Sequence, residues 1–219
     1  MIRLSRCASM NALEMLVQQS RLALLAVILT SLTCGKPEPT AHLSGTPGDW
    51  SIGPATARVV LVEYGDYQCP PCVALDRVVT ETLTKHPTDV RFIFRHYPTR
   101  RHSNAERAAQ AAEAAGAQGK FWQMHAQLFE HQVEWYGLAD PMPVFAKYAR
   151  AIGLDMRRFT EDLSARRFRA KIGASKEEGK RLGVRGTPAL FINGERVRLP
   201  LRSEDLESEI VARFNSGNR

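Results

Sequence analysis

The sequence predicts one α/β domain over residues 49–219. Three observations lead to this fold class: a β-α-β pattern at residues 58–96, a block of helical patterns at about residues 100–183, and a hairpin signal followed by a last helix. The chain has 219 residues, more than one average domain and fewer than two. We therefore expect one core, with the helical block as its elaboration.

The β-α-β unit begins with a strand at Arg58–Tyr64, a nearly continuous apolar run rich in β-branched residues, as in a buried parallel strand. A second strand is expected at Val90–His96. Between them, apolar residues recur at helical spacing, namely Val73, Leu75, Val78, Val79 and Leu83. Cys69 and Cys72 are thus predicted where a strand is followed by the N-terminus of a helix.

Helices are expected after the second strand. Ser103 is positioned to cap an alanine-rich helix over residues 104–117, Gly119 interrupts it, and an amphipathic helix follows over residues 121–131. Further helices are expected at about residues 143–152 and 155–182.

A hairpin and a helix close the domain. Asn193-Gly194 is a strong turn signal between two short strands within residues 186–199, and a helical pattern covers residues 203–214. The sequence contains no internal repeat or low-complexity tract.

Composition excludes wholesale disorder and a polytopic membrane protein: 44% of the residues are hydrophobic, 24% are charged and the mean hydropathy is −0.28. The net charge is +7, and the chain after residue 33 is only mildly basic. Several arginines alternate with Glu161 and Asp162 and are interpreted as a solvated helix face: Arg157, Arg158, Arg166, Arg167 and Arg169. No nucleic-acid-binding motif accompanies them, so no nucleic-acid partner is expected.

Residues 1–34 are interpreted as an export signal. The apolar run Leu22–Leu29 is too short to span a bilayer, and the long stretch before it suggests translation from Met10 or Met15. Residues 31–34 imperfectly resemble a lipoprotein signal, so lipidation of Cys34, simple cleavage and an uncleaved anchor are the alternatives. Residues 35–48 are rich in proline and glycine and are expected to be a flexible tether. The predicted location is the bacterial cell envelope, periplasmic or extracytoplasmic, with membrane tethering as one alternative.

Export leaves Cys69 and Cys72 as the two cysteines of the mature domain. Outside the cytoplasm such a C-x-x-C pair is a structural bridge, half of a metal site or a redox centre. A zinc site needs four ligands, and no second pair follows at suitable spacing. A bridge across two residues closes too small a loop to constrain the unfolded chain, so redox chemistry is favoured.

Five segments carry a family resemblance. They are Val62–Cys72, Arg95–Pro98, Gln118–Trp122, Gly186–Pro188 and Phe191–Gly194, and in this order they resemble the DsbA-like branch of the thioredoxin superfamily. The resemblance implies a thioredoxin fold with a helical insertion between the second strand and the strand that follows Pro188. It also implies an envelope thiol–disulfide oxidoreductase that needs no cofactor and acts on cysteine-containing envelope proteins together with a redox partner.

The two cysteines fit this chemistry on their own terms. Residues three apart on a first helical turn lie on one face, at a separation that a Cys69–Cys72 disulfide tolerates. Cys69, at the exposed end, is expected to be the nucleophile because the helix N-terminus favours a thiolate, and Cys72 is expected to resolve mixed disulfides. Pro70 and Pro71 suit the first turn and are expected to contact substrate. Typical DsbA proteins have a histidine between the cysteines, and its absence here predicts an intermediate redox potential.

Two further positions are predicted to take part. Glu63 lies within an apolar strand six residues before Cys69, where the resembling families keep a buried acid, and it is expected to exchange a proton with Cys72. The alternative is a solvent-facing position on an edge strand. In the resembling fold Thr187-Pro188 faces the cysteines with a cis bond, so the Thr187 backbone is expected to bind substrate and Pro188 to stand over the dithiol. Asp66, Tyr67 and Gln68 are expected to shape the approach.

Other features receive structural interpretations. Four histidines would indicate a metal site only where two converge, and none is expected: His96, His102, His125 and His131. Five aromatic residues are read as the core of the insertion, some lining a peptide groove: Phe121, Trp122, Phe129, Trp135 and Tyr136. Oxidation of other proteins is the expected activity. A reductase or isomerase using the same residues and a dithiol Cu(I) carrier are the alternatives.

Overall fold

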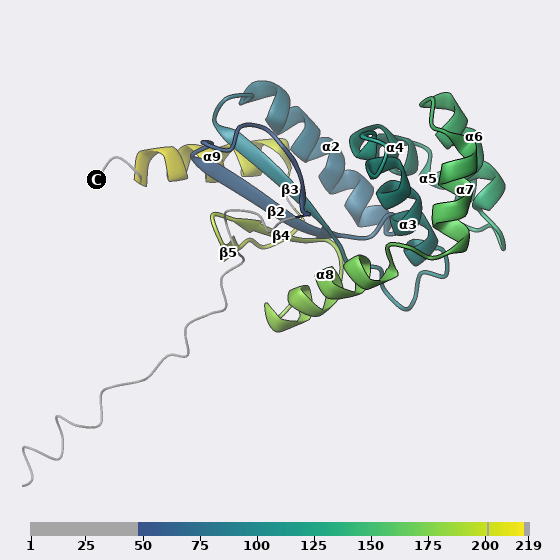
Figure 1. The fold of residues 1–219 in the computed structure, drawn as a ribbon. Coiled ribbons are helices and arrows are strands. Elements are labelled where there is room, and N and C mark those ends of the chain that lie inside the picture. The colour runs from purple at the N-terminus through teal and green to yellow at the C-terminus, as the bar shows by residue number, and fades with distance from the viewer. Residues whose placement is uncertain (1–47, 201, 217–219) are drawn as a thin grey trace, which may run out of the picture. The chain divides into compact units, whose positions relative to one another are not determined.

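The computed structural model describes residues 48–200 and 202–216 (Figure 1). The predicted export signal, Cys34 and all but the last residue of the predicted tether lie outside them. The described elements are, in chain order, β1 (Trp50–Ile52), β2 (Val59–Gly65), α2 (Pro70–Lys85), β3 (Val90–His96), α3 (Ala105–Gly116), α4 (Phe121–Glu130), α5 (Gln132–Trp135), α6 (Met142–Ala151), α7 (Met156–Ser164), α8 (Arg169–Arg181), β4 (Ala189–Ile192), β5 (Glu195–Arg196) and α9 (Ser203–Ser216). No helix among the described residues is long and apolar enough to cross a membrane.

The sheet has the strand order β1-β3-β2-β4-β5, which places β2 at its centre. β2 is parallel to β3, as the β-α-β pattern predicts, and antiparallel to β4. β4 and β5 form the predicted hairpin. Asn193 and Gly194 in its turn have φ angles of 49° and 84°, the left-handed values that such a turn requires. The predicted α/β class is confirmed.

Strand β1 is absent from the sequence-based prediction. Its three residues pair antiparallel with β3, Trp50 opposite Phe94, and are too few to show an alternating pattern. Tertiary contacts hold it in place, because Trp50 stacks on Phe121 at 4.5 Å and its indole N–H donates to Glu113. The helical insertion follows the strand Val90–His96, as predicted; this strand is third in chain order because β1 precedes it.

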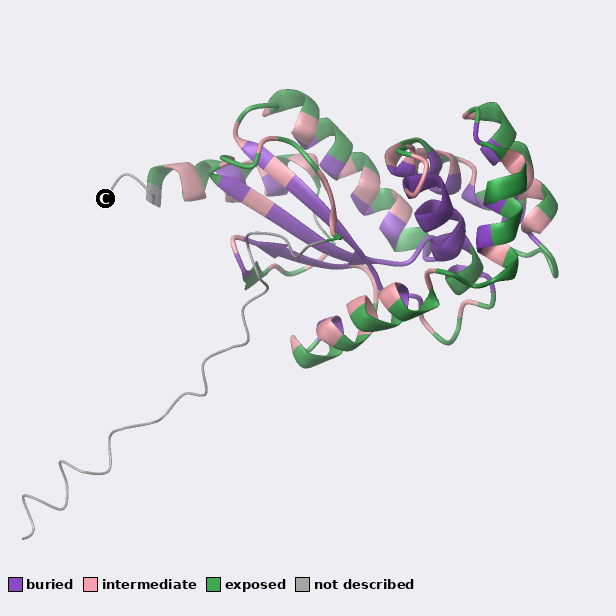
Figure 2. Cartoon of the chain, viewed as in Figure 1, coloured by how far each residue is buried: buried purple, intermediate pink, exposed green. Residues whose placement is uncertain are grey.

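Alternation along the strands separates two apolar layers. Leu61 and Phe94 point toward α2, α9 and the first insertion helices, whereas Val62, Ile93 and Phe191 belong to a smaller cluster on the other face. Helix α8 contacts β3, and its closing residue Leu182 packs against that smaller cluster. Figure 2 shows β2 and β3 buried along almost their whole length, as expected for strands covered on both faces.

The insertion departs from its prediction at two points. The helix expected at residues 155–182 is two helices, because α7 ends in a Schellman motif: Arg166 has a φ of 48°, its N–H bonds Leu163 O, and Arg167 N–H bonds Asp162 O. Glycine usually fills the left-handed position, so an arginine there gives no stop signal. Arg166 and Arg167 consequently lie in the turn rather than on the predicted helix face. Ser103 does not cap α3, whose N-cap is Asn104.

Candidate active site

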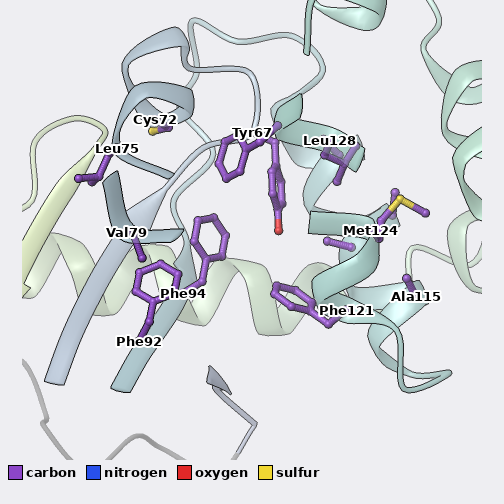
Figure 3. Packing of buried hydrophobic residues seen from close by; sticks show 14 of the residues in the cluster. Tyr67, Cys72, Leu75, Val79, Phe92, Phe94, Ala115, Phe121, Met124 and Leu128 are labelled. Carbon is purple, nitrogen blue, oxygen red and sulfur yellow. The ribbon is translucent and has the colours of Figure 1, made fainter. Parts of the chain in front are cut away.

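Cys69 and Cys72 lie at the N-terminus of α2, as predicted. Cys69 is the N-cap residue, with extended backbone angles, and Pro70 opens the helix, where a missing N–H costs nothing. Cys72 lies on the side of the helix that faces the sheet, in line with Leu75 and Val79 (Figure 3). The two thiols are not bonded to each other in this structure.

The expected exposure of Cys69 is wrong. Its residue is only 4% exposed and that of Cys72 is fully buried, whereas Pro70 and Pro71 are exposed. The cause is the loop before β4: as a thiol, Cys69 donates to the backbone oxygen of Thr187 at 3.3 Å. The exposed surface next to the two cysteines therefore belongs mainly to Pro70 and Pro71.

Opposite shifts separate the acidities of the two thiols. A hydrogen bond from the Cys72 thiol does most to lower the pKa of Cys69, to about 6. Burial opposes this, a hydrogen bond from the Thr187 side chain lowers the pKa further, and the Asp66 charge raises it slightly. Burial raises the pKa of Cys72 well above its ordinary value, and Cys69 and Glu63 add to this. At neutral pH the pair is thus arranged to hold one negative charge, on Cys69.

The thiolate absorbance of the reduced protein is expected to rise with pH in a step centred at about pH 6. Ultraviolet absorbance suits this measurement because it needs no reagent to reach a buried thiol. Replacing Cys69 with serine should remove the step, and replacing Cys72 with alanine should move it to higher pH because the main stabilising hydrogen bond is lost. A wild-type step at the ordinary cysteine value of about 8.5 would contradict the assignment.

Glu63 lies on the central strand, on the face that α2 covers, flanked in register by Phe94 and Leu190. The side chain is fully buried, so the solvent-facing alternative is excluded. Gly65 leaves room for it, because a Cβ there would lie 2.8 Å from Glu63 Oε1 and would collide with the Phe94 ring.

No described donor lies in good hydrogen-bonding geometry to either Glu63 oxygen. Burial, followed by the charges of Asp76 and Cys69, raises the pKa of Glu63 well above its ordinary value; contact with the Cys72 thiol opposes this more weakly. The result is a carboxyl group that holds its proton beside the dithiol.

The Thr187–Pro188 bond is cis, as the family resemblance implies, and the hydrogen bond from the Cys69 thiol places Thr187 directly against that cysteine. Leu199–Pro200 is also cis, which was not predicted.

Asp66 and Gln68 form the frame of the active-site loop. Asp66 is buried and accepts hydrogen bonds from the backbone N–H groups of Gln68 and Thr99, and it pairs with His102 at 2.8 Å. The Gln68 side chain accepts a hydrogen bond from the Asn104 backbone N–H and donates one to the Tyr136 carbonyl oxygen. These residues fix the loop around Cys69 rather than merely lining the approach.

A hydrogen-bonded chain of buried Tyr67, buried His125 and half-buried Asp76 is missing from the sequence-based prediction. His125 Nε2 lies 2.9 Å from Asp76 Oδ1 and Nδ1 lies 3.0 Å from the Tyr67 hydroxyl. With Nε2 protonated, His125 donates to the carboxylate and accepts from the phenol, which satisfies all three groups. Tyr67 packs between Phe94 and the helices of the insertion (Figure 3).

The other histidines among the described residues do not join this chain. His96 pairs with buried Glu113 and His102 pairs with Asp66. Among the described residues no group of three or more potential ligands is suited to a metal ion.

Comparisons with known proteins point in one direction. The model of a family described as Thioredoxin matches residues 45–212. A thioredoxin-like oxidoreductase from Silicibacter pomeroyi is 27% identical, with a TM-score of 0.66 over 80% of this chain and 96% of that one. BdbD from Bacillus subtilis is 20% identical, with a TM-score of 0.71 over 81% of this chain and 99% of that one, and shares the fold.

A curated relative is much longer than the matched region. The Na(+)/H(+) antiporter NhaA 3 of Salinispora tropica is 39% identical over 165 residues, which are 75% of this chain and 24% of that protein. This chain thus spans about a quarter of the curated relatives it matches.

Proposed function

Because the chain belongs to the thioredoxin family and has its DsbA-like fold, we propose that it is an exported thiol–disulfide oxidoreductase of the bacterial envelope, acting mainly as an oxidant through Cys69 and Cys72. The observation that carries the proposal is the separation of the two thiol acidities, one lowered to a pKa of about 6 and the other raised. Such a pair has one sulfur suited to attack and to leave and one suited to stay protonated.

In the oxidising direction, a client thiolate attacks Cys69 Sγ of the Cys69–Cys72 disulfide. The S–S bond breaks, and Cys72 leaves with the electron pair and takes a proton from Glu63. A second client thiolate then attacks the client sulfur of the mixed disulfide and releases Cys69 as a thiolate. Two electrons have passed from the client to the dithiol, and an envelope redox partner removes them.

Neighbouring residues support these steps in the proposal. Thr187 presents a backbone oxygen beside Cys69 Sγ, where an extended client can pair with the chain as an added strand. Pro188 has no backbone N–H, so it cannot compete with the client for hydrogen bonds at this position. Pro70 and Pro71 are exposed next to the nucleophile and provide apolar contact.

The pKa of Cys69 supports an intermediate potential. A value of about 6 lies between the nucleophilic cysteines of DsbA, about 3.5, and thioredoxin, about 7. We expect a potential between about −120 mV and about −270 mV, the values of those two proteins.

Two measurements test the proposal. The oxidised protein, mixed with reduced unfolded ribonuclease, should convert client thiols to disulfides in a stoichiometric first turnover, and the Cys69→Ala/Cys72→Ala double variant should not. Equilibration of the dithiol with glutathione buffers should give the intermediate potential. A potential at or below that of thioredoxin would support the reductase alternative, and no loss of client thiols would contradict the proposal.

A further inference from the structure

The strand directions bring three loops to the same edge of the sheet as the dithiol. β2 and β3 are parallel and end there, β4 begins there because it is antiparallel to β2, and β5 returns there from the hairpin. Hydrogen bonds show that these loops are close together: the Tyr97 N–H donates to the Gly65 carbonyl oxygen at 2.7 Å, and the loop before β4 contacts Cys69 through Thr187.

These loops carry four exposed arginines that we call the basic rim: Arg100, Arg101, Arg185 and Arg198. None of the four has an ion pair or a side-chain hydrogen bond with any described residue, unlike several arginines of the helices. Arg185 lies two residues before Thr187, and Arg100 follows Thr99, whose N–H is bonded to Asp66. The rim thus lies around the cysteine that the proposed reaction uses first.

No exposed carboxylate balances the rim within its own loops. Residues 97–103, 183–188 and 197–200 contain no Asp or Glu. The nearby Asp66 has a fully buried side chain whose oxygens are taken by His102 and backbone N–H groups.

Cations crowd one another at this edge. Lys176, from α8, donates to the carbonyl oxygen of Pro98, beside the rim. Burial lowers the pKa of Lys176, and the positive charges of Lys180 and Arg100 lower it further; the charges of Asp66 and Glu106 oppose this only in part. An anionic partner would relieve this repulsion.

Apolar contact area accompanies the charge. Tyr136 and Leu138 are 44% and 40% exposed, and their carbonyl oxygens accept from Gln68 and Asn104, which places them beside the residue that precedes Cys69. On the other side, an open pocket of about 480 Å³ has both arginine and apolar side chains in its lining, namely Pro188, Ala189, Arg196, Val197, Arg198 and Leu199.

From this arrangement we propose that the basic rim selects clients whose reactive cysteine lies in an extended acidic segment. The inference rests on the proposed function and specifies its substrate class. The client cysteine reaches Cys69 beside Thr187, while Asp or Glu residues on either side of it meet the rim arginines. Arginine pairs well with carboxylates, and charge complementarity acts mainly on the rate of encounter.

The experiment measures the rate at which the oxidised protein reacts with reduced peptides of one length, each with a single cysteine flanked by Glu, Gln or Lys. Each rate is divided by the rate of the same peptide with a small disulfide, which removes differences in thiol acidity. At low salt the normalised rate for the Glu peptide should exceed that for the Lys peptide by about tenfold or more, and salt should reduce the ratio.

Charge reversal identifies the residues. Arg185→Glu and Arg198→Glu together should remove or invert the preference, whereas Arg150→Glu, a change of an exposed arginine on α6 away from the dithiol, should leave it unchanged. The Gln peptide should react at a similar rate with all variants, which shows that the fold and the dithiol are intact.

Three outcomes would overturn the inference. Equal normalised rates for the Glu and Lys peptides, with the Gln peptide reactive, would refute it and leave the proposed function standing. No reaction with any peptide would refute the proposed function and the client preference with it. Loss of binding to anionic vesicles in the Arg185→Glu and Arg198→Glu variants, with peptide rates unchanged, would assign the rim to a lipid surface instead.

Discussion

Cys72→Ser is expected to accumulate mixed disulfides between Cys69 and client proteins, while Cys69→Ser accumulates on the order of a tenth as many or fewer. Without Cys72, no buried thiol remains to attack the Cys69–client bond, so the intermediate persists. Without Cys69, the remaining thiol is fully buried and its pKa is raised, so it is both inaccessible and protonated. Turnover should be lost in both variants.

The measurement is non-reducing electrophoresis of envelope extracts expressing each variant, followed by mass spectrometry of the cross-linked species. A serine hydroxyl at the buried Cys72 position could disturb packing, so Cys72→Ala serves as the second trapping variant and thermal unfolding as the fold control. Comparable yields of adducts from the Cys69 and Cys72 variants would reject the division of roles.

Replacing Glu63 is expected to stabilise the reduced protein near neutral pH and to slow its chemistry. The folded-state pKa of this carboxyl is raised by burial, so the folded protein binds its proton more tightly than the unfolded chain does. The tighter proton binding stabilises the folded state fully when the pH is below the pKa of Glu63 in the unfolded chain, about 4.5. This stabilisation is lost as the pH rises toward the raised pKa of Glu63 in the folded protein. Glu63→Leu should therefore be more stable at neutral pH, by roughly 1–3 kcal/mol, and less dependent on pH.

The chemical effect uses Glu63→Gln, which keeps the shape and removes the titrating proton. Proton transfer by a positioned acid contributes about 100-fold or more, so attack on the Cys69–Cys72 disulfide and resolution by Cys72 should slow by that order and lose their pH dependence. The pKa of Cys69 should change little, which separates loss of proton transfer from loss of the nucleophile. Rates that match the wild type across the pH range would return Glu63 to a structural role.

Glu113 is the matched control for stability. It is also buried, but hydrogen bonds and charges from His96 and Lys171 outweigh burial and lower its pKa. Its contribution is present above the unfolded pKa and is lost as pH falls through the folded one. Glu113→Gln should consequently destabilise the protein at neutral pH, the opposite sign to Glu63→Leu. Denaturant midpoints across pH measure both changes in stability, and changes of the same sign would contradict the opposite roles of the two carboxyl groups.

Features encoded by short patterns could be predicted from the sequence. The β-α-β unit, the Asn193-Gly194 hairpin and the position of the dithiol each follow from a run of adjacent residues. The burial of Glu63 also follows locally, because alternation on a central strand places it on the face covered by α2.

Features that depend on distant contacts could not be predicted. β1 is held by Phe121 and Glu113, more than 60 residues away, and the burial of Cys69 is due to Thr187, 118 residues further along. The chain of Tyr67, His125 and Asp76 joins the active-site loop, α4 and α2. These residue types occur both in cores and on surfaces, so the sequence alone does not indicate that they meet. Arg166 ends α7 in a conformation that its residue type disfavours, so only the backbone shows it.

The position of His125 determines whether the helical insertion can be removed from this protein. The imidazole of His125, which belongs to the insertion, is the hydrogen-bond partner of both Asp76 on α2 and Tyr67 in the active-site loop. A shortened chain that joined β3 directly to α8 would leave Asp76 and Tyr67 without their shared partner next to Glu63. The insertion is therefore not a detachable module added to a self-sufficient redox domain. Attempts to graft this dithiol onto a smaller scaffold, or to exchange insertions between relatives, must carry His125 and its two partners together.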